Sequence, residues 1–428
     1  MTLATVLAGA ALVLSGGTVI DGYGNAPIPD GIIVIEGDRI LAVGGPGQVA
    51  IPEGAEVVST EGMTVLPGLW DMQADLMRLG HGDARRWNET YGPLAERVVM
   101  PIAARQLLQS GVTSARDVAA PLEAATRVRG RVREKIIDGP SLYVSGPALR
   151  KLAPAGTGTW QWEVAGAPDV RAKVQRLANA GVDYLLLADL ELWTAEELEA
   201  VVSEARIRGL SVHAIADKPA DVVRGAAAQL DGFLGTIPVN GPYPAEMMQA
   251  ITGRLTQAGA RPMAWTPAIS VALNLESLKI NDEPLDDPRA TAQLPELVAA
   301  DIKGSLAGLG SALPEQAAAP ALCEKLRQLD EAKVLLLLGS GAGAPGHLHS
   351  RATWQEIDFW VRGCGLPAVR AIRAATHDAA TAMGVGHESG AISPGKIADV
   401  IAVRGDVLRD PALLQSVDIV VKGGRRVR

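Results

Sequence analysis

The stretch of residues 66–75 constrains the fold of this chain more than any other. An apolar run, residues 63–66, meets a Pro-Gly turn signal, and a second short apolar run then ends in polar residues at alternating positions. Such a pattern predicts a turn that leads into a buried strand. Because side chains alternate along a strand, Gln73 and Asp75 should share one face at its C-terminal end. We therefore expect a functional site where this strand ends.

Downstream of this strand, strand-like runs alternate with helix-like runs, a pattern that predicts βα units and a parallel barrel. The further strands are expected at residues 111–117, 141–147, 181–187, 210–216, 230–234, 262–265 and 334–338. The helices are expected at residues 99–110, 170–180, 194–208, 220–229, 247–258 and 322–332. Thr194 with Glu197 forms a capping-box pattern at the start of one helix. The long stretch of residues 270–320 predicts a helical excursion or a lid.

Short β-branched segments near both ends of the chain predict a second β structure. Between residues 11 and 65 such segments alternate with turn signals, which is typical of part of a β-sandwich. Near the other end, Ser-Pro-Gly-Lys-Ile-Ala-Asp (residues 393–399) precedes a buried run. Residues 418–427 have the pattern of a hairpin with a Gly-Gly turn.

The length and net charge of the chain limit its domain organisation and its possible partners. A chain of 428 residues is too long for one small core, so a large barrel with an accessory domain is expected. The net charge of −8 argues against nucleic acid or an anionic membrane as the main partner. The apolar residues 1–14 lack the positive region of a secretory signal and are too short to span a bilayer. We predict a cytoplasmic protein, with the periplasm as the alternative.

The two cysteines, Cys323 and Cys364, are too few for a disulfide framework or a metal cluster. We expect both to be buried free thiols. Neither has a histidine partner nearby in the sequence, and the chain has no Gly-x-Ser-x-Gly nucleophile elbow. A covalent serine or cysteine mechanism is therefore not predicted.

These motifs resemble the amidohydrolase superfamily, in its imidazolonepropionase-like and prolidase-like branch. There, Pro-Gly-Leu-Ile-Asp precedes His-x-His at the first barrel strand, and Ser-Pro-Gly-Lys-x-Ala-Asp is a further family mark. The resemblance runs from about Leu12 to Val427. It implies a distorted (β/α)8 TIM barrel at residues 66–387, with a composite β-sandwich from residues 1–65 and 388–428. It also implies zinc or a similar divalent metal and hydrolysis of C–N bonds.

The positions of the family's metal ligands carry unusual residues in this chain. In chain order, these positions are Gln73, Asp75, Leu186, Ile215, Gly235 and Gly341. They replace a His-x-His pair, a carboxylated lysine, two histidines and an aspartate. Of the six, only Asp75 is a good ligand, and apolar walls make a buried dication costly. We therefore predict that these residues line an emptied pocket and that no metal cofactor is bound.

A relocated metal site is the alternative. Asp75, His213 and Asp217 are candidates for it, because strand alternation points His213 into the same barrel interior as Ile215. A ligand set needs several convergent groups. A hydrogen-bonded buried His213 and a loop Asp217 are therefore the favoured interpretation.

Further polar residues follow the expected strands. His347 and His349 lie in a glycine-flanked loop, where we expect solvent exposure. Arg116 and Asp117 end the second strand and are expected to form an ion-paired structural feature, with Asp117 as a weaker catalytic candidate. His377 is expected to serve in capping or packing.

Three functions follow as hypotheses. The first is a metal-free pseudoenzyme, a structural or regulatory subunit in a hetero-oligomer with an active amidohydrolase paralogue, or else a homo-oligomer. The second is a hydrolase of amide, peptide-like or cyclic amide C–N bonds. It would use a relocated metal at Asp75 and His213, or a metal-free mechanism with Asp75 as general base. The third is a protein that binds a small-molecule ligand in the former metal pocket.

Overall fold

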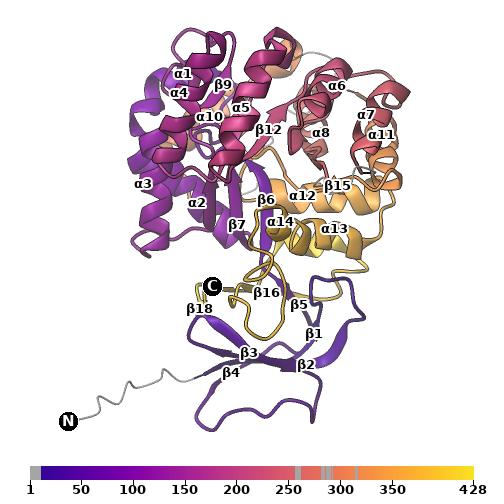
Figure 1. Cartoon of the computed structure of the whole chain (residues 1–428). Helices are drawn as coiled ribbons and strands as arrows, with labels where there is room; N and C mark the ends of the chain where they lie inside the picture. Colours follow the sequence, from indigo (N-terminus) through magenta and orange to yellow (C-terminus); the bar gives the residue numbers. More distant parts are fainter. Residues whose placement is uncertain (1–10, 256–261, 281–284, 286–290, 292, 314–316) are drawn as a thin grey trace, which may run out of the picture. The chain divides into compact units, whose positions relative to one another are not determined.

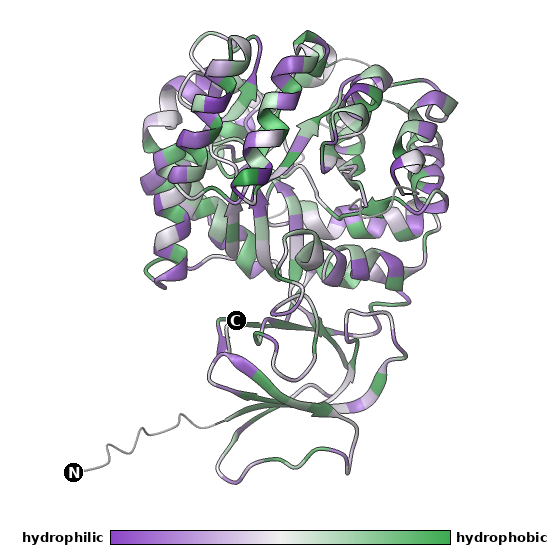
Figure 2. Cartoon of the chain, in the orientation of Figure 1, coloured by the Kyte–Doolittle hydropathy of each residue, from purple (hydrophilic) through white to green (hydrophobic). Residues whose placement is uncertain are grey.

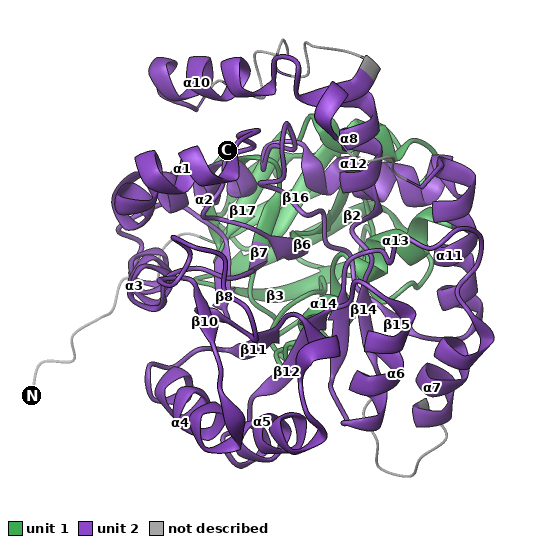
Figure 3. Ribbon diagram, turned by 90° about the horizontal axis from the view of Figure 1, so that it is seen from above, with its two compact units in different colours: residues 1–70, 109–113, 367–428 green, residues 71–108, 114–366 purple. Residues whose placement is uncertain are grey.

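The computed structural model describes residues 11–255, 262–280, 285, 291, 293–313 and 317–428. These residues divide into two compact units (Figure 3). Unit 1 comprises the described residues up to Trp70 together with residues 109–113 and 367–428. Unit 2 comprises residues 71–108 and the described part of residues 114–366. Unit 1 is larger than the sandwich expected at residues 1–65 and 388–428, since it includes two short helices, α13 (Ala368–Ala374) and α14 (His377–Ala382).

Unit 1 is built on one sheet that joins the two ends of the chain (Figure 1). The strand order is β18-β17-β16-β5-β1-β2-β3, and β4 also pairs with β1. The strands are β1 (Leu12–Val19), β2 (Ile28–Glu36), β3 (Arg39–Gly44), β4 (Glu56–Ser59), β5 (Met63–Pro67), β16 (Val400–Arg404), β17 (Ile419–Lys422) and β18 (Arg425–Arg426). The antiparallel pairing of β5 with β16 makes the junction between the N-terminal and C-terminal parts. The predicted Gly-Gly hairpin is present between β17 and β18.

Side-chain alternation explains why residues 32–35 of β2 are all apolar. Ile33 and Ile35 are buried in one core cluster with Val400 and Ala402 of β16. Ile32 and Val34, which alternate with them, belong to a second buried cluster with Val13. The strand is therefore covered on both faces, which selects β-branched residues at successive positions.

Two sheets of parallel strands lie largely in unit 2, although residues 69–70 and 112–113 at the start of two of the strands belong to unit 1. One has the order β6-β7-β8 and the other β10-β9-β11-β12-β13-β14-β15. The strands are β6 (Leu69–Ala74), β7 (Val112–Asp117), β8 (Ser141–Val144), β9 (Ala148–Arg150), β10 (Gln161–Glu163), β11 (Tyr184–Leu187), β12 (Ser211–Ile215), β13 (Gly232–Leu234), β14 (Ala264–Thr266) and β15 (Leu335–Leu336). Each predicted barrel strand is therefore present, although several are shorter than expected.

Individual backbone hydrogen bonds join the edges of these two sheets. Asp183, just before β11, donates from its backbone N to the carbonyl oxygen of Val144 at 2.8 Å. At the other edge, Met72 of β6 donates to Leu338 at 2.9 Å, after β15. The ring formed in this way has eight strands: β6, β7, β8, β11, β12, β13, β14 and β15. Among the described residues, no continuous ladder of hydrogen bonds joins the two sheets at either junction. The arrangement is that of a TIM-barrel-like α/β fold.

The helices of unit 2 surround these strands (Figure 3). They are α1 (Ala84–Tyr91), α2 (Met100–Gln109), α3 (Leu122–Arg133), α4 (Gly166–Asn179), α5 (Ala195–Ile207), α6 (Pro219–Ala227), α7 (Ala245–Leu255), α8 (Ile269–Ile280), α10 (Glu296–Leu306), α11 (Ala319–Glu331) and α12 (Ala352–Asp358). Polar and apolar residues alternate along them, as expected of helices with one buried face (Figure 2). Among the described residues, no helix is both long and apolar enough to cross a membrane.

The predicted helical details are confirmed where the structure describes them. Thr194 and Glu197 form the expected capping box at the start of α5. The described part of residues 270–320 is the expected helical excursion, with most of α8 followed by α10 and the short helix η4 (Leu309–Ala312). Residues 256–258, the end of the helix predicted at 247–258, and the first ten residues lie outside the described residues.

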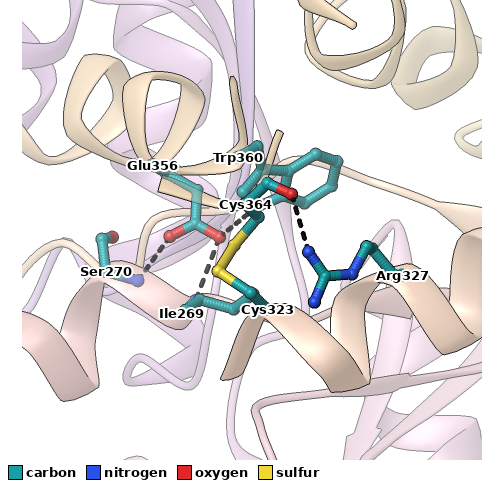
Figure 4. The surroundings of a disulfide bond; sticks show 7 residues. All are labelled: Ile269, Ser270, Cys323, Arg327, Glu356, Trp360 and Cys364. Atoms are coloured by element: carbon teal, nitrogen blue, oxygen red, sulfur yellow. Dashed lines mark hydrogen bonds between the residues drawn. A yellow bond between two sulfur atoms is a disulfide. The ribbon is translucent and has the colours of Figure 1, made fainter. Parts of the chain in front are cut away.

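The prediction of two free thiols is wrong, because Cys323 and Cys364 form a disulfide bond (Figure 4). Cys323 lies in α11, and Cys364 follows the short helix η5 (Phe359–Gly363). The two cysteines are 41 residues apart in the sequence, but their Cα atoms are only 4.8 Å apart. Arg327 strengthens the same contact by donating from Nη1 to the carbonyl oxygen of Cys364 at 3.2 Å.

Replacing either cysteine should destabilise unit 2. A disulfide restricts the unfolded chain, so Cys323→Ser should lower the free energy of unfolding by about 2–4 kcal/mol. Cys364→Ser should cost a similar amount, and the double variant little more than either single variant, because the same bond is lost. Urea unfolding of the oxidised protein measures these losses. Full additivity of the two substitutions would contradict a bond between these residues.

Candidate active site

The polar residues of β6 are fixed by a buried carboxylate, Asp71. Asp71 accepts hydrogen bonds from the backbone N and side-chain hydroxyl of Ser340, from Thr353 Oγ1 at 2.7 Å and from the backbone N of Gln73 at 3.0 Å. Burial raises the pKa of Asp71, and these hydrogen bonds lower it. The sequence analysis did not single out Asp71, although the Pro-Gly-Leu-x-Asp frame contains it.

Asp75 follows the last residue of β6, at the end where barrel folds carry their chemistry. Its side chain is 23% exposed and forms an ion pair with Arg78 at 3.3 Å. Asp75 Oδ1 also accepts from the backbone N of Met77 at 3.0 Å. Burial raises the pKa of Asp75 to about 6, and the Arg78 charge and this hydrogen bond lower it. Asp75 is therefore a carboxylate that solvent reaches and that titrates near neutral pH.

Asp117 ends the neighbouring strand β7 and is fully buried. Its Oδ1 accepts from the backbone N of Leu76 at 3.0 Å, the residue next to Asp75. Its Oδ2 is buried and has no hydrogen-bond partner within the described part of the chain. Burial raises the pKa of Asp117 to about 8, with the negative charge of Asp75 as the second cause.

The two strand ends therefore bring together two carboxyl groups with different proton affinities. At neutral pH, Asp75 is ionised and Asp117 holds a proton. A pair of titratable groups whose surroundings separate their pKa values is the usual basis for acid and base roles in one site. At neutral pH, the carboxylate of Asp75 can therefore accept a proton, and the carboxylic acid of Asp117 can donate one.

Arg116 lies deeper in unit 2 and is not ion-paired with Asp117, so the predicted ion pair is wrong. Its Nε donates to the carbonyl oxygen of Met72 at 2.8 Å, and its Nη2 donates to Thr266 Oγ1 at 3.3 Å. The guanidinium lies over the Tyr184 ring, 5.0 Å from its centroid. Consecutive residues of a strand face opposite ways, which separates the side chains of Arg116 and Asp117.

His213 is buried beside this guanidinium. Its Nδ1 lies 3.4 Å from Arg116 Nη1. Burial lowers the pKa of His213 well below its usual value, and the charge of Arg116 lowers it further. His213 is therefore a neutral, hydrogen-bonded core residue, as favoured from the sequence.

The relocated metal site is not assembled among the described residues. Asp217 is exposed, whereas His213 is buried against Arg116. No group of three or more His, Cys, Asp or Glu side chains that could hold a metal ion occurs in the part of the chain that the structure describes.

The former ligand positions do not suit a divalent metal. Leu186 is buried in a small cluster with Tyr184 and Leu234, and Ile215 is 37% exposed. Gly235 and Gly341 both have positive φ angles, +92° and +66°. Aliphatic and glycine residues offer no side-chain donors. The chemistry of this set therefore does not fit the zinc-type ion that the resemblance implies.

Gln73 is the remaining residue of this set. Its carbonyl oxygen accepts from the backbone N of Gly341 at 2.7 Å, which holds β6 against the segment after β15. Its side-chain Oε1 is buried without a hydrogen-bond partner among the described residues. A Cβ on Gly339 would lie 2.7 Å from the backbone N of Gln73, so the glycine permits this close approach.

The prediction that His347 and His349 are exposed is wrong, since both are fully buried. His347 Nε2 lies 3.1 Å from Ser270 Oγ and 3.1 Å from the carbonyl oxygen of Ser340. His349 Nε2 lies 3.1 Å from the carbonyl oxygen of Asp75. Burial lowers the pKa of His347 to about 3 and that of His349 to about 4. Both imidazoles are neutral and support the strand ends.

Glu356 is a further buried polar residue that the sequence analysis missed. It accepts from the backbone N of Ile269 at 3.0 Å and of Ser270 at 2.6 Å, at the N-terminus of α8 (Figure 4). Trp360 Nε1 donates to the same carboxylate at 2.7 Å. The first N–H groups of a helix have no partner within it, so by accepting from two of them Glu356 fixes the start of the helix that carries Ser270.

Comparisons with known proteins agree with this fold. Residues 318–427 match the sequence model of the amidohydrolase family. A Xaa-Pro dipeptidase with bound methionine in its active site is 22% identical, with a TM-score of 0.77 over 98% of this chain and 100% of that chain. Ochratoxinase of A. niger is 20% identical, with a TM-score of 0.73 over 98% of this chain and 96% of that chain.

The structure of molinate hydrolase is also similar: it is 19% identical, with a TM-score of 0.74 over 98% of this chain and 95% of that chain. No curated protein matches the sequence. The fold is therefore TIM-barrel-like with an additional domain. The resemblance to the amidohydrolase superfamily is confirmed. The prediction of a non-catalytic subunit gains no support from these neighbours.

The buried carboxyl group of Asp117 should make stability depend on pH. Its pKa is raised in the folded state to about 8 from an ordinary value of 3.8. Its contribution to stability is therefore complete below the unfolded pKa and is lost as the pH rises through about 8. Asp117→Asn resembles the protonated acid, so the variant should lose less stability than the parent between about pH 5 and pH 8.

Urea unfolding across this pH range measures the difference. Asp75 shifts in the same direction, so part of the pH dependence should remain in the variant. Asp38→Asn, at a carboxylate that is 65% exposed, is the control and should follow the parent. Identical pH dependence in Asp117→Asn and the parent would contradict a protonated Asp117.

Restoring the family aspartate at Gly341 should destabilise unit 2. A Cβ there would lie 2.3 Å from Val271 Cγ2, in a backbone conformation with positive φ. We expect Gly341→Asp to lower the free energy of unfolding by about 1–3 kcal/mol. Gly235→Asp is a matched control, because its φ is also positive but its Cβ would contact nothing within 4 Å. Equal losses in the two variants would contradict the steric argument.

Proposed function

We propose that this chain is a distorted (β/α)8 hydrolase of C–N bonds in amides, peptide-like substrates or cyclic amides, with Asp75 as its general base. The observation that carries the proposal is the pair of carboxyl groups at the ends of β6 and β7, whose surroundings raise both pKa values and separate them. The hydrolase fold shared with the solved neighbours supports it.

The mechanism assigns one proton transfer to each carboxyl group. Asp75 accepts a proton from water as the water oxygen attacks the carbonyl carbon of the substrate. Asp117 donates its proton to the leaving nitrogen as the C–N bond breaks, which gives a carboxylic acid and an amine. Asp75 is then protonated and Asp117 ionised, and return of the proton from Asp75 to the neighbouring Asp117 restores the starting state. Arg78 holds Asp75 in place through its ion pair.

A panel of an N-acyl amino acid, an Xaa-Pro dipeptide and a cyclic amide tests the proposal after dialysis against a chelator. We expect turnover by the parent protein. Asp75→Asn should lower kcat on the order of 10²–10⁴-fold, the usual contribution of a general base. The profile of kcat/KM against pH should fall below about pH 6 and above about pH 8, as Asp75 gains and Asp117 loses its proton.

Asp217→Asn is the matched control, because Asp217 is exposed and has no role in this mechanism. Loss of activity in that variant together with loss on chelation would instead favour the relocated metal. Absence of turnover with all three substrate classes would overturn the proposal.

A second candidate function is a metal-free subunit that assembles with an active amidohydrolase paralogue. The specific observation in its favour is the set of poor metal ligands at the family positions, with buried Leu186 at the place of the lysine. Co-purification from the native source distinguishes the two functions. A protein that runs alone as a homo-oligomer and turns over a substrate contradicts the subunit hypothesis.

A further inference from the structure

A cavity of about 410 Å³ lies in unit 2 among the segments that follow β6 and β7. Met77 lies two residues after Asp75, and Pro121 lies four residues after Asp117. Loops at the C-terminal ends of barrel strands are where substrates bind in this fold class. The volume is within the range of small-molecule sites.

The wall of this cavity is in direct contact with the proposed general base. Arg78 pairs with Asp75 at 3.3 Å, and its guanidinium also lies over the ring of Trp160, 5.5 Å from the centroid. Met77 donates from its backbone N to Asp75 Oδ1. Trp87 Nε1 in turn donates to the carbonyl oxygen of Met77 at 2.7 Å. A ligand in the cavity would therefore contact Met77, which holds Asp75 through its backbone N.

The inner wall of the cavity is apolar. Met77, Ala95 and Trp160 are 4%, 3% and 7% exposed and form part of the lining, together with Pro93. Burying an apolar group against such a wall is favourable at roughly 25 cal/mol per Å² of surface removed from water. The cavity therefore suits a ligand with a hydrocarbon or aromatic body.

The charged part of the lining is acidic. Glu96 and Glu123 both contribute to it. Glu96 is paired with Arg127 at 3.1 Å. Within the described residues, Glu123 has no ion-pair partner, and it lies in the first turn of α3. A cation at this edge would gain a carboxylate neighbour, whereas an anion would be repelled.

We propose that this cavity binds an organic cation, a compact apolar body that carries an ammonium group, and that it selects amides with such a group. Its role in substrate selection rests on the proposed hydrolase function, but the binding itself does not. The apolar wall holds the body of the ligand, and Glu123 faces its charge.

Isothermal titration calorimetry with the whole chain tests the proposal. The probe is 2-phenylethylammonium, and phenylacetate is the matched anion of similar size. We expect the cation to bind at least about tenfold more tightly than the anion. Glu123→Gln should weaken binding of the cation about threefold to fivefold, the effect of one exposed charge pair. Glu331→Gln, at an exposed carboxylate in the last turn of α11, should leave binding unchanged.

Equal affinity for the two probes, no measurable binding, or unchanged affinity in Glu123→Gln would overturn the proposal. Far-UV circular dichroism establishes that Glu123→Gln is folded. Ala124→Leu, which adds volume to the lining, is a second variant and should weaken binding of both probes. Unchanged affinity for the cation in Ala124→Leu would also contradict the cavity as its binding site.

Turnover assays of the parent protein separate this inference from the proposed function. Cation binding by the parent without turnover of any amide would support the cavity and reject the hydrolase. Turnover without a preference for cationic amides would support the hydrolase and reject the role of the cavity in selection.

Discussion

A single buried carboxylate, that of Asp71, connects the first strand of unit 2 to the segment after its last strand. Its partners, Ser340 and Thr353, are far from it in the sequence, and the ring of strands depends on contacts of this kind where no ladder closes it. Gln73 follows on the same strand and Asp75 comes directly after it, so their placement depends on this junction. The side chains of the candidate site are therefore held by buried polar bonds as well as by apolar packing.

Arg116 and Asp117 of unit 2 are buried without an ion-pair partner among the described residues. Arg116 has no carboxylate within ion-pair distance among the described residues, and Asp117 keeps an oxygen without a partner. Transferring a charge out of water is costly, so Asp117 retains a proton while histidines in the same interior lose theirs. The buried guanidinium of Arg116 also disfavours a second positive charge nearby, on His213. These protonation states are compatible with the proton transfers proposed for the carboxyl groups.

Much of the fold could be predicted because strands, helices and turns leave periodic local signals. The strand ending at Gln73 and Asp75 and the capping box at Thr194 are examples of such signals. Features that depend on long-range contacts could not be predicted. The pairing of Cys323 with Cys364 needs the packing of α11 against η5, and the burial of His347 needs a loop that folds inward. The raised pKa of Asp117 arises from neighbours that no local pattern reveals.

The disulfide also changes how the chain behaves before it folds. It closes a covalent loop that contains β15 and the segment with Ser340, His347 and Thr353. In an oxidised unfolded chain, residues on either side of this loop are already close, so the entropic cost of bringing α11 to η5 has been met. The shorter effective separation favours early formation of this part of unit 2, because folding slows as contacts become more distant along the chain. The partners of Asp71 would then be gathered on one preformed segment before β6 joins them.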